Sequence, residues 1–264
     1  MKKGIVFFDL DGTLLDNSCD QVPDSALLGL SELRKNGYVI VLSTGRDMDT
    51  HYSVKYKDIV KPDAIIHRNG NRITIGEEEL FIHYMDKGLL RRIIDFCLIN
   101  GLCVGTSIGE SDYFTIPEEK TRSDVSYRGF SERNYRSVEE LFNDDILVSA
   151  IDFAGNIKKA KTLVEAKFPE LTLFPFNSGT GADVVETGFS KADGMVRLCE
   201  YYRIPIENTY AFGDSQNDIP MLKKAAVGVA VGNAADSVKE AADMVTDHIS
   251  DGGIYNALKL LKLI

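Results

Sequence analysis

The first part of the chain alternates short apolar runs with amphipathic stretches, a pattern typical of a buried sheet covered by helices. Ile5–Leu10 opens on an unbroken apolar run, as expected for a parallel strand that is buried on both faces. Asp24 or Ser25 can start a helix with a stripe of leucines, and Gly37 is placed to end it. Tyr38–Leu42 is a second apolar run, so these residues predict a strand, a helix and a parallel strand.

The last third of the chain repeats this order of helices and short apolar strands. Both parts together predict an α/β core of the Rossmann-like kind, with a parallel sheet and helices on both of its faces. The elements predicted here are helices at Ala192–Tyr202, Asp218–Ala226, Ser237–Ala242 and Ile254–Leu263, and strands at Thr209–Phe212, Val227–Val231 and Met244–Val245.

The middle of the chain follows a different pattern. Two amphipathic helices are predicted, at Lys87–Asn100 and Asn156–Phe168, among short strand-like stretches. Helices on a mostly antiparallel sheet favour a separate α+β module that is inserted into the α/β core. We therefore assign residues 1–83 and 186–264 to the core domain and residues 84–185 to the insertion. The predicted strands of the insertion are Leu102–Ser107, Asp112–Ile116, Leu147–Phe153 and Leu171–Phe174.

Composition and charge narrow the range of partners. With 44% apolar and 27% charged residues, the chain has the composition of an ordinary soluble globular protein. A net charge of −10 at pH 7 disfavours nucleic acid and anionic membranes as partners. The same charge means that an anionic substrate needs local positive charge, from a metal ion or from cationic side chains.

The cysteines, the histidines and the N-terminus favour a reducing cytoplasm. The four cysteines include no CxxC pair, and the four histidines show no metal-binding spacing. The apolar runs are strand-length, and residues 1–9 lack the length and the cleavage site of a secretory signal. We therefore expect a cytoplasmic protein, with a monomer as the default. The cysteines, expected as free thiols, are Cys19, Cys97, Cys103 and Cys199.

Polar residues gather where three of the predicted strands end. An Asp-Leu-Asp sequence at residues 9–11 closes the first strand, Ser43–Arg46 follow the second, and Gly213–Asp218 follow a strand near the C-terminus. Since the carboxyl ends of parallel strands meet at one edge of an open sheet, these clusters are expected to converge. Turn formation explains any one cluster. It does not explain why carboxylates dominate at two of the three strand ends.

The sequences at these strand ends resemble motifs of the haloacid dehalogenase-like (HAD) superfamily. Asp-Leu-Asp-Gly-Thr-Leu at residues 9–14 and Gly-Asp-Ser-Gln-Asn-Asp at residues 213–218 resemble its first and fourth motifs. Ser-Thr-Gly-Arg at residues 43–46 resembles the second motif, and Ser190-Lys191 with Gly194 resembles the third. All four occur in the order of the family, so the resemblance covers the whole core.

The insertion resembles that of one branch of this superfamily. The long segment between the second and third motifs resembles the large α+β cap, type IIB, of the Cof-type sugar phosphatases. Asn69-Gly70 also resembles the Asn-Gly step of that branch, whereas the neighbouring His67, Arg68 and Asn71 depart from the small residues that are more usual there. The resemblance therefore implies a core that carries the chemistry and a cap that selects the substrate.

The resemblance implies a magnesium-dependent phosphatase that hydrolyses small phosphomonoesters, sugar phosphates or related metabolites, through an aspartyl phosphate. Asp9 is implied to be the nucleophile. Asp11 is implied to protonate the leaving alcohol and then to take a proton from the water that hydrolyses the intermediate. Two aspartates two residues apart on an extended backbone lie on the same side of the strand, which suits these two roles.

Magnesium suits a site of oxygen ligands that retains several waters. The ligands implied by the resemblance are the carboxylates of Asp9 and Asp214 and the backbone carbonyl of Asp11, with Asp218 behind them. The residues implied to bind the phosphoryl group are Thr44, Gly45, Arg46, Lys191 and Asn217.

Several of these residues, and others in the cap, have ordinary structural alternatives. Taken alone, Lys191 is typical of an exposed lysine at the start of a helix. For Arg46, an ion pair or a surface position is as good an interpretation as a contact with phosphate. Near the expected hinge, Asp183 and Glu186 are interpreted as solvated or structural. Cap candidates for substrate contact, most of them better explained as a solvated charged face, are Tyr113, Glu118, Glu119, Lys120 and Arg122.

Three alternative functions remain to be weighed. A dehalogenase of this superfamily would attack carbon without magnesium and would not need Asp11. A phosphomutase would return the phosphoryl group to a sugar, but phosphomutases of this superfamily usually carry their cap between the first and second motifs, where this chain has a short interval. A non-catalytic sensor of a phosphorylated metabolite would be expected to lack the nucleophile or the proton-handling aspartate, and both are present.

Overall fold

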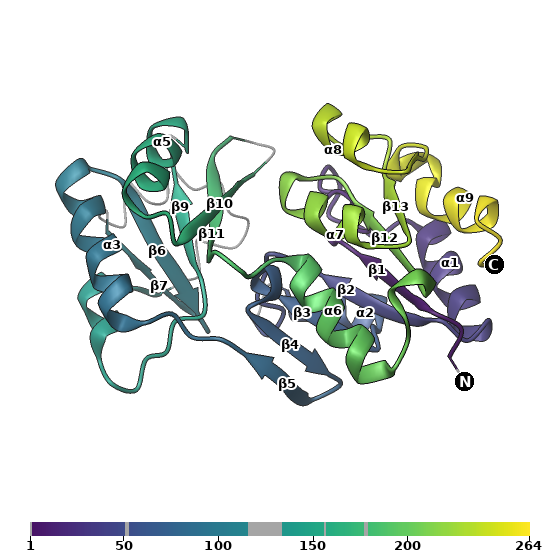
Figure 1. Cartoon of the computed structure of the whole chain (residues 1–264), viewed down its shortest axis with the longest axis horizontal. Coiled ribbons are helices and arrows are strands. Elements are labelled where there is room, and N and C mark those ends of the chain that lie inside the picture. Colours follow the sequence, from purple (N-terminus) through teal and green to yellow (C-terminus); the bar gives the residue numbers. More distant parts are fainter. Residues whose placement is uncertain (1, 51–52, 116–133, 156, 177–178) are drawn as a thin grey trace. The chain divides into compact units, whose positions relative to one another are not determined.

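The computed structural model describes residues 2–50, 53–115, 134–155, 157–176 and 179–264 (Figure 1). The chain packs into two compact units. The first unit consists of Met1–Arg46, Lys55–Phe81 and Phe189–Ile264, and the second of Asp47–Val54 and Ile82–Gly188.

The described residues of the first unit form one sheet. Its strands are β1 (Ile5–Phe8), β2 (Val39–Ser43), β3 (Ala64–His67), β4 (Arg72–Ile75), β5 (Glu78–Ile82), β12 (Thr209–Gly213), β13 (Val227–Ala230) and β14 (Met244–Val245). Their order is β14-β13-β12-β1-β2-β3-β4-β5, parallel from β14 to β3, with β4 antiparallel to β3. All four residues of β1 are fully buried, as expected for a central parallel strand.

The helices of the first unit fall into two groups. They are α1 (Asp24–Lys35), α2 (Val54–Val60), α6 (Lys191–Tyr202), α7 (Ile219–Lys224), α8 (Asp236–Ala241) and α9 (Gly253–Leu260). α1 packs on α9, whereas α6 packs on α7, which also contacts α8 (Figure 1). Right-handed crossovers that step in opposite directions from β1 place these two groups on opposite faces of the sheet. Among the described residues, no helix combines the length and the apolar composition needed to span a bilayer.

The predicted fold class is confirmed, since a mostly parallel α/β core accompanies a second, mixed sheet. Two details of the core differ from the prediction. The β4–β5 hairpin was not predicted, because Glu77–Glu79 interrupt the apolar pattern at this edge of the sheet. The helix predicted over Asp218–Ala226 starts earlier, as a 3-10 turn at Gln216–Asp218, and α7 ends at Lys224.

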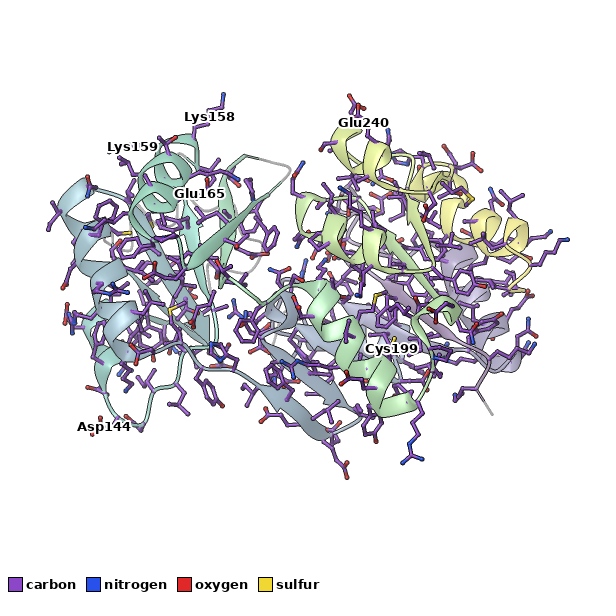
Figure 2. All side chains as sticks on the ribbon, viewed as in Figure 1. Asp144, Lys158, Lys159, Glu165, Cys199 and Glu240 are labelled. Carbon is purple, nitrogen blue, oxygen red and sulfur yellow. The ribbon has the colours of Figure 1, made fainter. Side chains whose placement is uncertain are left out.

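The described residues of the second unit form a mixed sheet covered by two helices. The strands are β6 (Cys103–Ile108), β7 (Ser111–Phe114), β8 (Asn134–Ser137), β9 (Ile151–Ala154), β10 (Leu171–Pro175) and β11 (Gly181–Glu186), in the order β10-β11-β9-β6-β7-β8. Neighbouring strands are antiparallel except β7 and β8. The helices α3 (Lys87–Asn100) and α5 (Ile157–Lys167) pack on this sheet around an apolar core. Lys158, Lys159 and Glu165, labelled in Figure 2, are exposed side chains of α5.

Several predictions for the second unit need correction. Tyr113, a candidate for substrate contact, is a buried member of the apolar core. The strand predicted over Leu147–Phe153 begins only at Ile151, and β8 and β11 were not predicted. For Asp183, expected to be solvated or structural, the structural alternative holds, because it is only 8% exposed within β11. The other cap candidates, Glu118, Glu119, Lys120 and Arg122, lie outside the described residues.

The chain leaves the first unit after Phe81 and returns to it at Phe189. The rings of these two residues stack with centroids 6.2 Å apart, and the Arg197 guanidinium lies 4.0 Å from the centroid of the Phe81 ring. Within the second unit, His83 Nε2 and Glu186 Oε1 are 2.8 Å apart. The outgoing and returning segments are therefore in contact on both sides of the boundary, through Phe81 and Phe189 in the first unit and through His83 and Glu186 in the second.

The turn after β3 brings this strand against the start of α6. Arg68, Asn69 and Gly70 all have positive φ, at 49°, 53° and 100°. Residues other than glycine seldom adopt this left-handed conformation, so Arg68 and Asn69 in succession mark a strained turn. At Gly70, a Cβ atom would lie 2.2 Å from the carbonyl oxygen of Ser190. The absence of a side chain at Gly70 thus lets the turn contact the residue before Lys191.

Replacing Gly70 by alanine is expected to lower the free energy of unfolding by about 3 kcal/mol, because left-handed strain and a backbone clash add together. Gly37→Ala is the matched control: Gly37 also has a positive φ, at 85°, but no atom lies within 4 Å of its Cβ position. The control is expected to lose only about 1 kcal/mol. Urea denaturation followed by circular dichroism measures both losses, and equal losses would show that Ser190 yields to the added methyl group.

Candidate active site

Elements of the first unit meet at the carboxyl edge of the parallel sheet. Asp9 follows β1, Thr44 follows β2 and Asp214 follows β12, while Lys191 is the first residue of α6. The Asp9 N–H donates to the Phe212 carbonyl at 3.0 Å, so the backbone hydrogen bonds between β1 and β12 continue as far as Asp9. The parallel register therefore brings together side chains from distant parts of the sequence.

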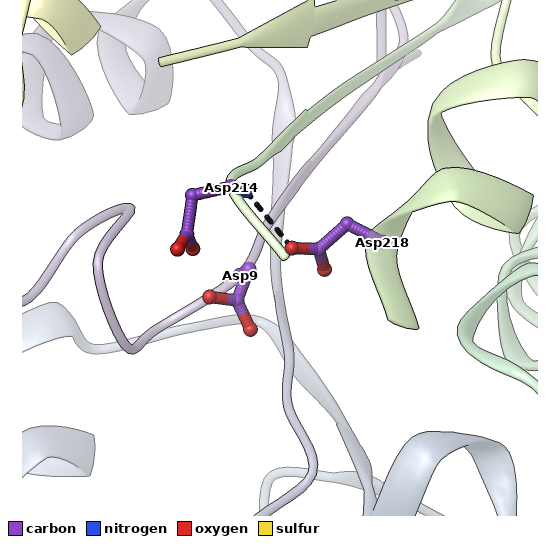
Figure 3. Close-up of side chains that lie close together, drawn as sticks. All are labelled: Asp9, Asp214 and Asp218. Carbon is purple, nitrogen blue, oxygen red and sulfur yellow. Dashed lines mark hydrogen bonds between the residues drawn. The ribbon is translucent and has the colours of Figure 1, made fainter. Parts of the chain in front are cut away.

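Three buried carboxylates lie at the centre of this edge (Figure 3). Asp9, Asp214 and Asp218 are 5%, 3% and 0% exposed, and each offers an oxygen atom within 4.8 Å of the other two. The fully buried ammonium of Lys191 lies 2.5 Å from Asp9 Oδ1 and 2.6 Å from Asp218 Oδ1. The cluster thus contains one ammonium group and three carboxylates. When all of them are ionised, it has an excess of negative charge that a bound cation would neutralise.

The donor atoms of this cluster fit a hard divalent cation. All of them are carboxylate oxygens, the ligands that magnesium prefers in proteins. Asp214 is already oriented, because the Thr13 hydroxyl donates to its Oδ1 and the Ser215 hydroxyl to its Oδ2, each at 3.0 Å. The cluster is therefore a candidate metal site.

Asp218 shapes the loop that follows β12. Its Oδ2 accepts a hydrogen bond from the backbone N–H of Asp214 at 2.9 Å (Figure 3). The same oxygen accepts from the Ser215 N–H at 2.9 Å, and Oδ1 accepts from Lys191. These contacts use both carboxylate oxygens for structure. The arrangement is compatible with a residue that stands behind the metal ligands and positions them.

The Asp11 side chain points to a different partner, the guanidinium group of Arg46. Arg46 Nε donates to Asp11 Oδ2 at 2.7 Å, and Arg46 Nη2 donates to Asp11 Oδ1 at 2.6 Å. The side chains of Arg46 and Asp11 are 20% and 36% exposed. The ion pair considered for Arg46 from the sequence is therefore formed, at the more open side of the site.

The remaining residues predicted to bind phosphate lie around this centre. The buried Thr44 hydroxyl accepts the Arg46 N–H at 3.1 Å, and Gly45 between them is half-buried. Asn217 donates from Nδ2 to Asn69 Oδ1 at 2.9 Å, which joins the turn after β3 to the loop after β12.

Sequence reasoning missed several residues that hold the site in place. Thr13 lies inside the first motif, where a hydroxyl next to two aspartates was a usable signal. Ser215 follows Asp214 directly and offered a similar signal. Asn233 donates from Nδ2 to the Gly12 carbonyl at 2.6 Å, across 221 positions of sequence, and nothing in its surroundings marked it.

Burial shifts the pKa values of the charged groups in this site. Burial raises the pKa of Asp9 well above its usual value of 3.8 and Asp218 raises it further, while Lys191 opposes the shift. Burial and Asp218 raise the pKa of Asp214 from 3.8 to about 7. Burial alone would lower the pKa of Lys191, but the carboxylates of Asp218 and Asp9 outweigh it and raise that pKa above its ordinary value. Lys191 therefore stays charged.

This fold and this acidic centre define a hydrolase of the haloacid dehalogenase type. The family model described as haloacid dehalogenase-like hydrolase matches residues 6–258, and the chain belongs to that family. Within it, the chain is a HAD-type phosphatase, a phosphoric monoester hydrolase that acts on small phosphomonoesters. The buried cluster of Asp9, Asp214 and Asp218 is consistent with the metal site of such hydrolases.

Relatives and solved structures of similar length agree with this class. The 5-amino-6-(5-phospho-D-ribitylamino)uracil phosphatase YcsE of Bacillus subtilis is 27% identical, over 97% of this chain and 94% of the relative. A phosphoglycolate phosphatase of Methanopyrus kandleri is 38% identical, over 97% of this chain and 96% of the relative. Among solved structures, the HAD subclass IIB sugar phosphatase BT4131 matches with a TM-score of 0.88 and 27% identity, over 99% of this chain and 100% of that chain.

The superfamily and the phosphatase class that the four motifs indicated are confirmed, as is the IIB branch that the insertion indicated. The roles of the single site residues stay predictions.

The raised pKa of Asp214 predicts how stability depends on pH when metal is removed by EDTA. The folded chain holds this proton more tightly than the unfolded chain, so the contribution is present at low pH and is lost as pH rises from about 4 to about 7. Asp214→Asn is expected to flatten this fall, by an amount on the order of a few kcal/mol. Urea denaturation at a series of pH values measures the difference. If the free energy of unfolding falls equally with pH in both proteins, the raised pKa of Asp214 is contradicted.

Proposed function

We propose that the chain is a magnesium-dependent phosphatase of small phosphorylated metabolites, sugar phosphates or related compounds, which forms an aspartyl phosphate on Asp9. The observation that carries this proposal is the contact between Asp9 and the buried Lys191 inside a cluster of three carboxylates. Among the described residues, Lys191 is the one side chain that hydrogen-bonds to Asp9, and it does so through Oδ1. This leaves Oδ2 as the nucleophilic oxygen.

In the first step, an O–P bond forms to Asp9 and the P–O bond to the leaving alcohol breaks. Lys191 remains charged and offsets the negative charge of the phosphoryl group. Because the Thr44 hydroxyl oxygen accepts the Arg46 N–H, the hydroxyl hydrogen remains to donate to a phosphoryl oxygen. Two groups of the chain thus bind the group that is transferred.

Asp11 is proposed to move the protons. Its side chain is 36% exposed, in contrast to the buried Asp9, so it can reach both a leaving alcohol and a water molecule. In the first step the leaving oxygen takes a proton from Asp11. In the second step water attacks phosphorus, the Asp9–phosphorus bond breaks, and the proton of the water passes to Asp11.

Asp9 and Asp214, with the backbone carbonyl of Asp11, are proposed to hold magnesium, which supplies Lewis-acid stabilisation of the charge on the phosphoryl oxygens. Magnesium fits this site because all the donor atoms are oxygens and because the buried carboxylates outnumber the buried cations. Asp218 keeps Asp214 in place through the backbone of the loop.

The proposed substrate class rests on what the similar proteins share. Their names describe a phosphoribityl compound, phosphoglycolate and sugar phosphates, all of them small phosphomonoesters. The net charge of −10 also disfavours polyanionic substrates such as nucleic acids. We therefore propose a small, singly phosphorylated metabolite, with sugar phosphates as the first compounds to test.

Purified protein is expected to release inorganic phosphate from several members of a panel of phosphomonoesters, with magnesium and not with EDTA. Asp9→Asn is expected to lower kcat by about 10³-fold or more, because the amide cannot form the covalent intermediate. Asp58→Asn, an exposed aspartate on α2, is the matched control and is expected to retain activity.

The panel contains sugar phosphates, phosphoglycolate, a phosphoribityl compound, a phosphopeptide and a short oligonucleotide. Phosphate release mainly from the phosphopeptide or the oligonucleotide would contradict the substrate class. Transfer of the phosphoryl group between two positions of a sugar, without release, would identify a mutase. Full turnover by Asp9→Asn would show that the nucleophile is another residue.

A further inference from the structure

The Asp11 carboxylate is held by both of its oxygen atoms at once. The two hydrogen bonds from Arg46, at 2.6 and 2.7 Å, come from different guanidinium nitrogens and reach different oxygens. This two-point contact fixes the plane of the carboxylate, which a single hydrogen bond would not do. Asp11 Oδ2 retains a second lone pair, so a proton can still be gained or given there.

Arg46 is itself fixed by its surroundings. Its N–H donates to the Thr44 hydroxyl at 3.1 Å, and its carbonyl accepts the Arg68 N–H at 3.1 Å. Its guanidinium carbon lies 5.3 Å from the centroid of the Tyr56 ring. Both the backbone and the head group of Arg46 therefore have defined positions before any substrate binds.

Tyr56 gives the guanidinium a rigid support. It is 2% exposed, and its hydroxyl donates to Asp20 Oδ1 at 2.6 Å. Asp20 Oδ2 in turn accepts from Lys55 Nζ at 2.7 Å. A connected set of contacts thus runs from Lys55 and Asp20 through Tyr56 and Arg46 to Asp11, and it contains none of the three buried carboxylates of the metal site.

We propose that Arg46 is a positioning residue, which orients the Asp11 carboxylate for proton transfer to the leaving oxygen and from water. This inference rests on the proposed phosphatase function and goes further, since it separates Arg46 from the residues that bind the phosphoryl group. In the first step Asp11 gives its proton to the leaving oxygen, and the resulting carboxylate remains bound to Arg46. In the second step the same carboxylate, still held in plane, receives the proton of the attacking water.

The proposal predicts that loss of Arg46 affects the leaving group and not the binding of phosphate. A poor leaving group such as an alkoxide needs a proton as the P–O bond breaks, whereas p-nitrophenolate does not. Arg46→Gln is therefore expected to lower kcat/KM for alkyl phosphates by about 10²-fold, because kcat/KM reports the first step, in which the leaving oxygen takes its proton. For p-nitrophenyl phosphate, we expect kcat/KM to stay within about threefold of the wild-type value, with inhibition by inorganic phosphate unchanged. Hydrolysis of the aspartyl phosphate is common to both substrates and also uses Asp11, so kcat is expected to fall with both.

Two further variants separate positioning from charge and from folding. Arg46→Lys keeps the positive charge but cannot make the two-point contact, so it is expected to show the same dependence on the leaving group. Arg91→Gln is the matched control, because Arg91 also binds both oxygens of a carboxylate, that of Glu139, and also lies over an aromatic ring, that of Phe142. The control is expected to behave as wild type with both kinds of substrate.

A double-mutant cycle with Asp11→Asn gives the deciding measurement. If Arg46 acts through Asp11, Arg46→Gln has no further effect on alkyl phosphate turnover once Asp11 is asparagine. An additive loss would overturn the proposal. So would a uniform loss across all leaving groups with weakened phosphate inhibition, because that result would make Arg46 a phosphate ligand. Phosphate release from no ester by the wild type would overturn the phosphatase function itself, and this inference with it.

Discussion

The buried ammonium group of Lys191 is the constraint on which the rest of the core depends. A charged lysine can be buried completely only where carboxylates surround it. Lys191 meets this condition through Asp9, which lies 182 positions earlier in the sequence, and through Asp218 in the turn after β12. The pairing of β1 with β12 brings these carboxylates together, and the turn at Gly70 packs against the residue that precedes the lysine. The sheet, the turn and α6 therefore have to form as one cooperative unit.

The active site has a deep half and a shallow half, and their electrostatics differ. In the deep half Asp9 and Lys191 are almost completely removed from water, so their interaction is strong and their positions are fixed. In the shallow half Asp11 and Arg46 are partly exposed, and their geometry is fixed by a planar two-point contact instead of by burial. The nucleophile lies where water is excluded, and the residue that exchanges protons lies where water can reach it.

Much of the core could be predicted from the sequence, because fully buried parallel strands leave unbroken apolar runs and their ends carry the chemistry. In the second unit, strand β11 could not, since it contains the buried Asp183, which breaks the apolar pattern. The partners of the site residues were also out of reach. The contacts of Asp11 with Arg46 and of Asn217 with Asn69 depend on the directions of side chains in space, and spacing along the chain does not encode these directions.

The stacked rings of Phe81 and Phe189 bear on how such a protein can evolve. They stand where the inserted segment begins and ends, and their centroids are only 6.2 Å apart. A short turn would be enough to close the core at this point, so the sheet owes none of its connectivity to the insertion. An insertion with adjacent ends can be lengthened, shortened or exchanged with little loss of loop-closure entropy. Lineages that share the catalytic edge are thus free to diversify in the inserted module without rebuilding the enzyme.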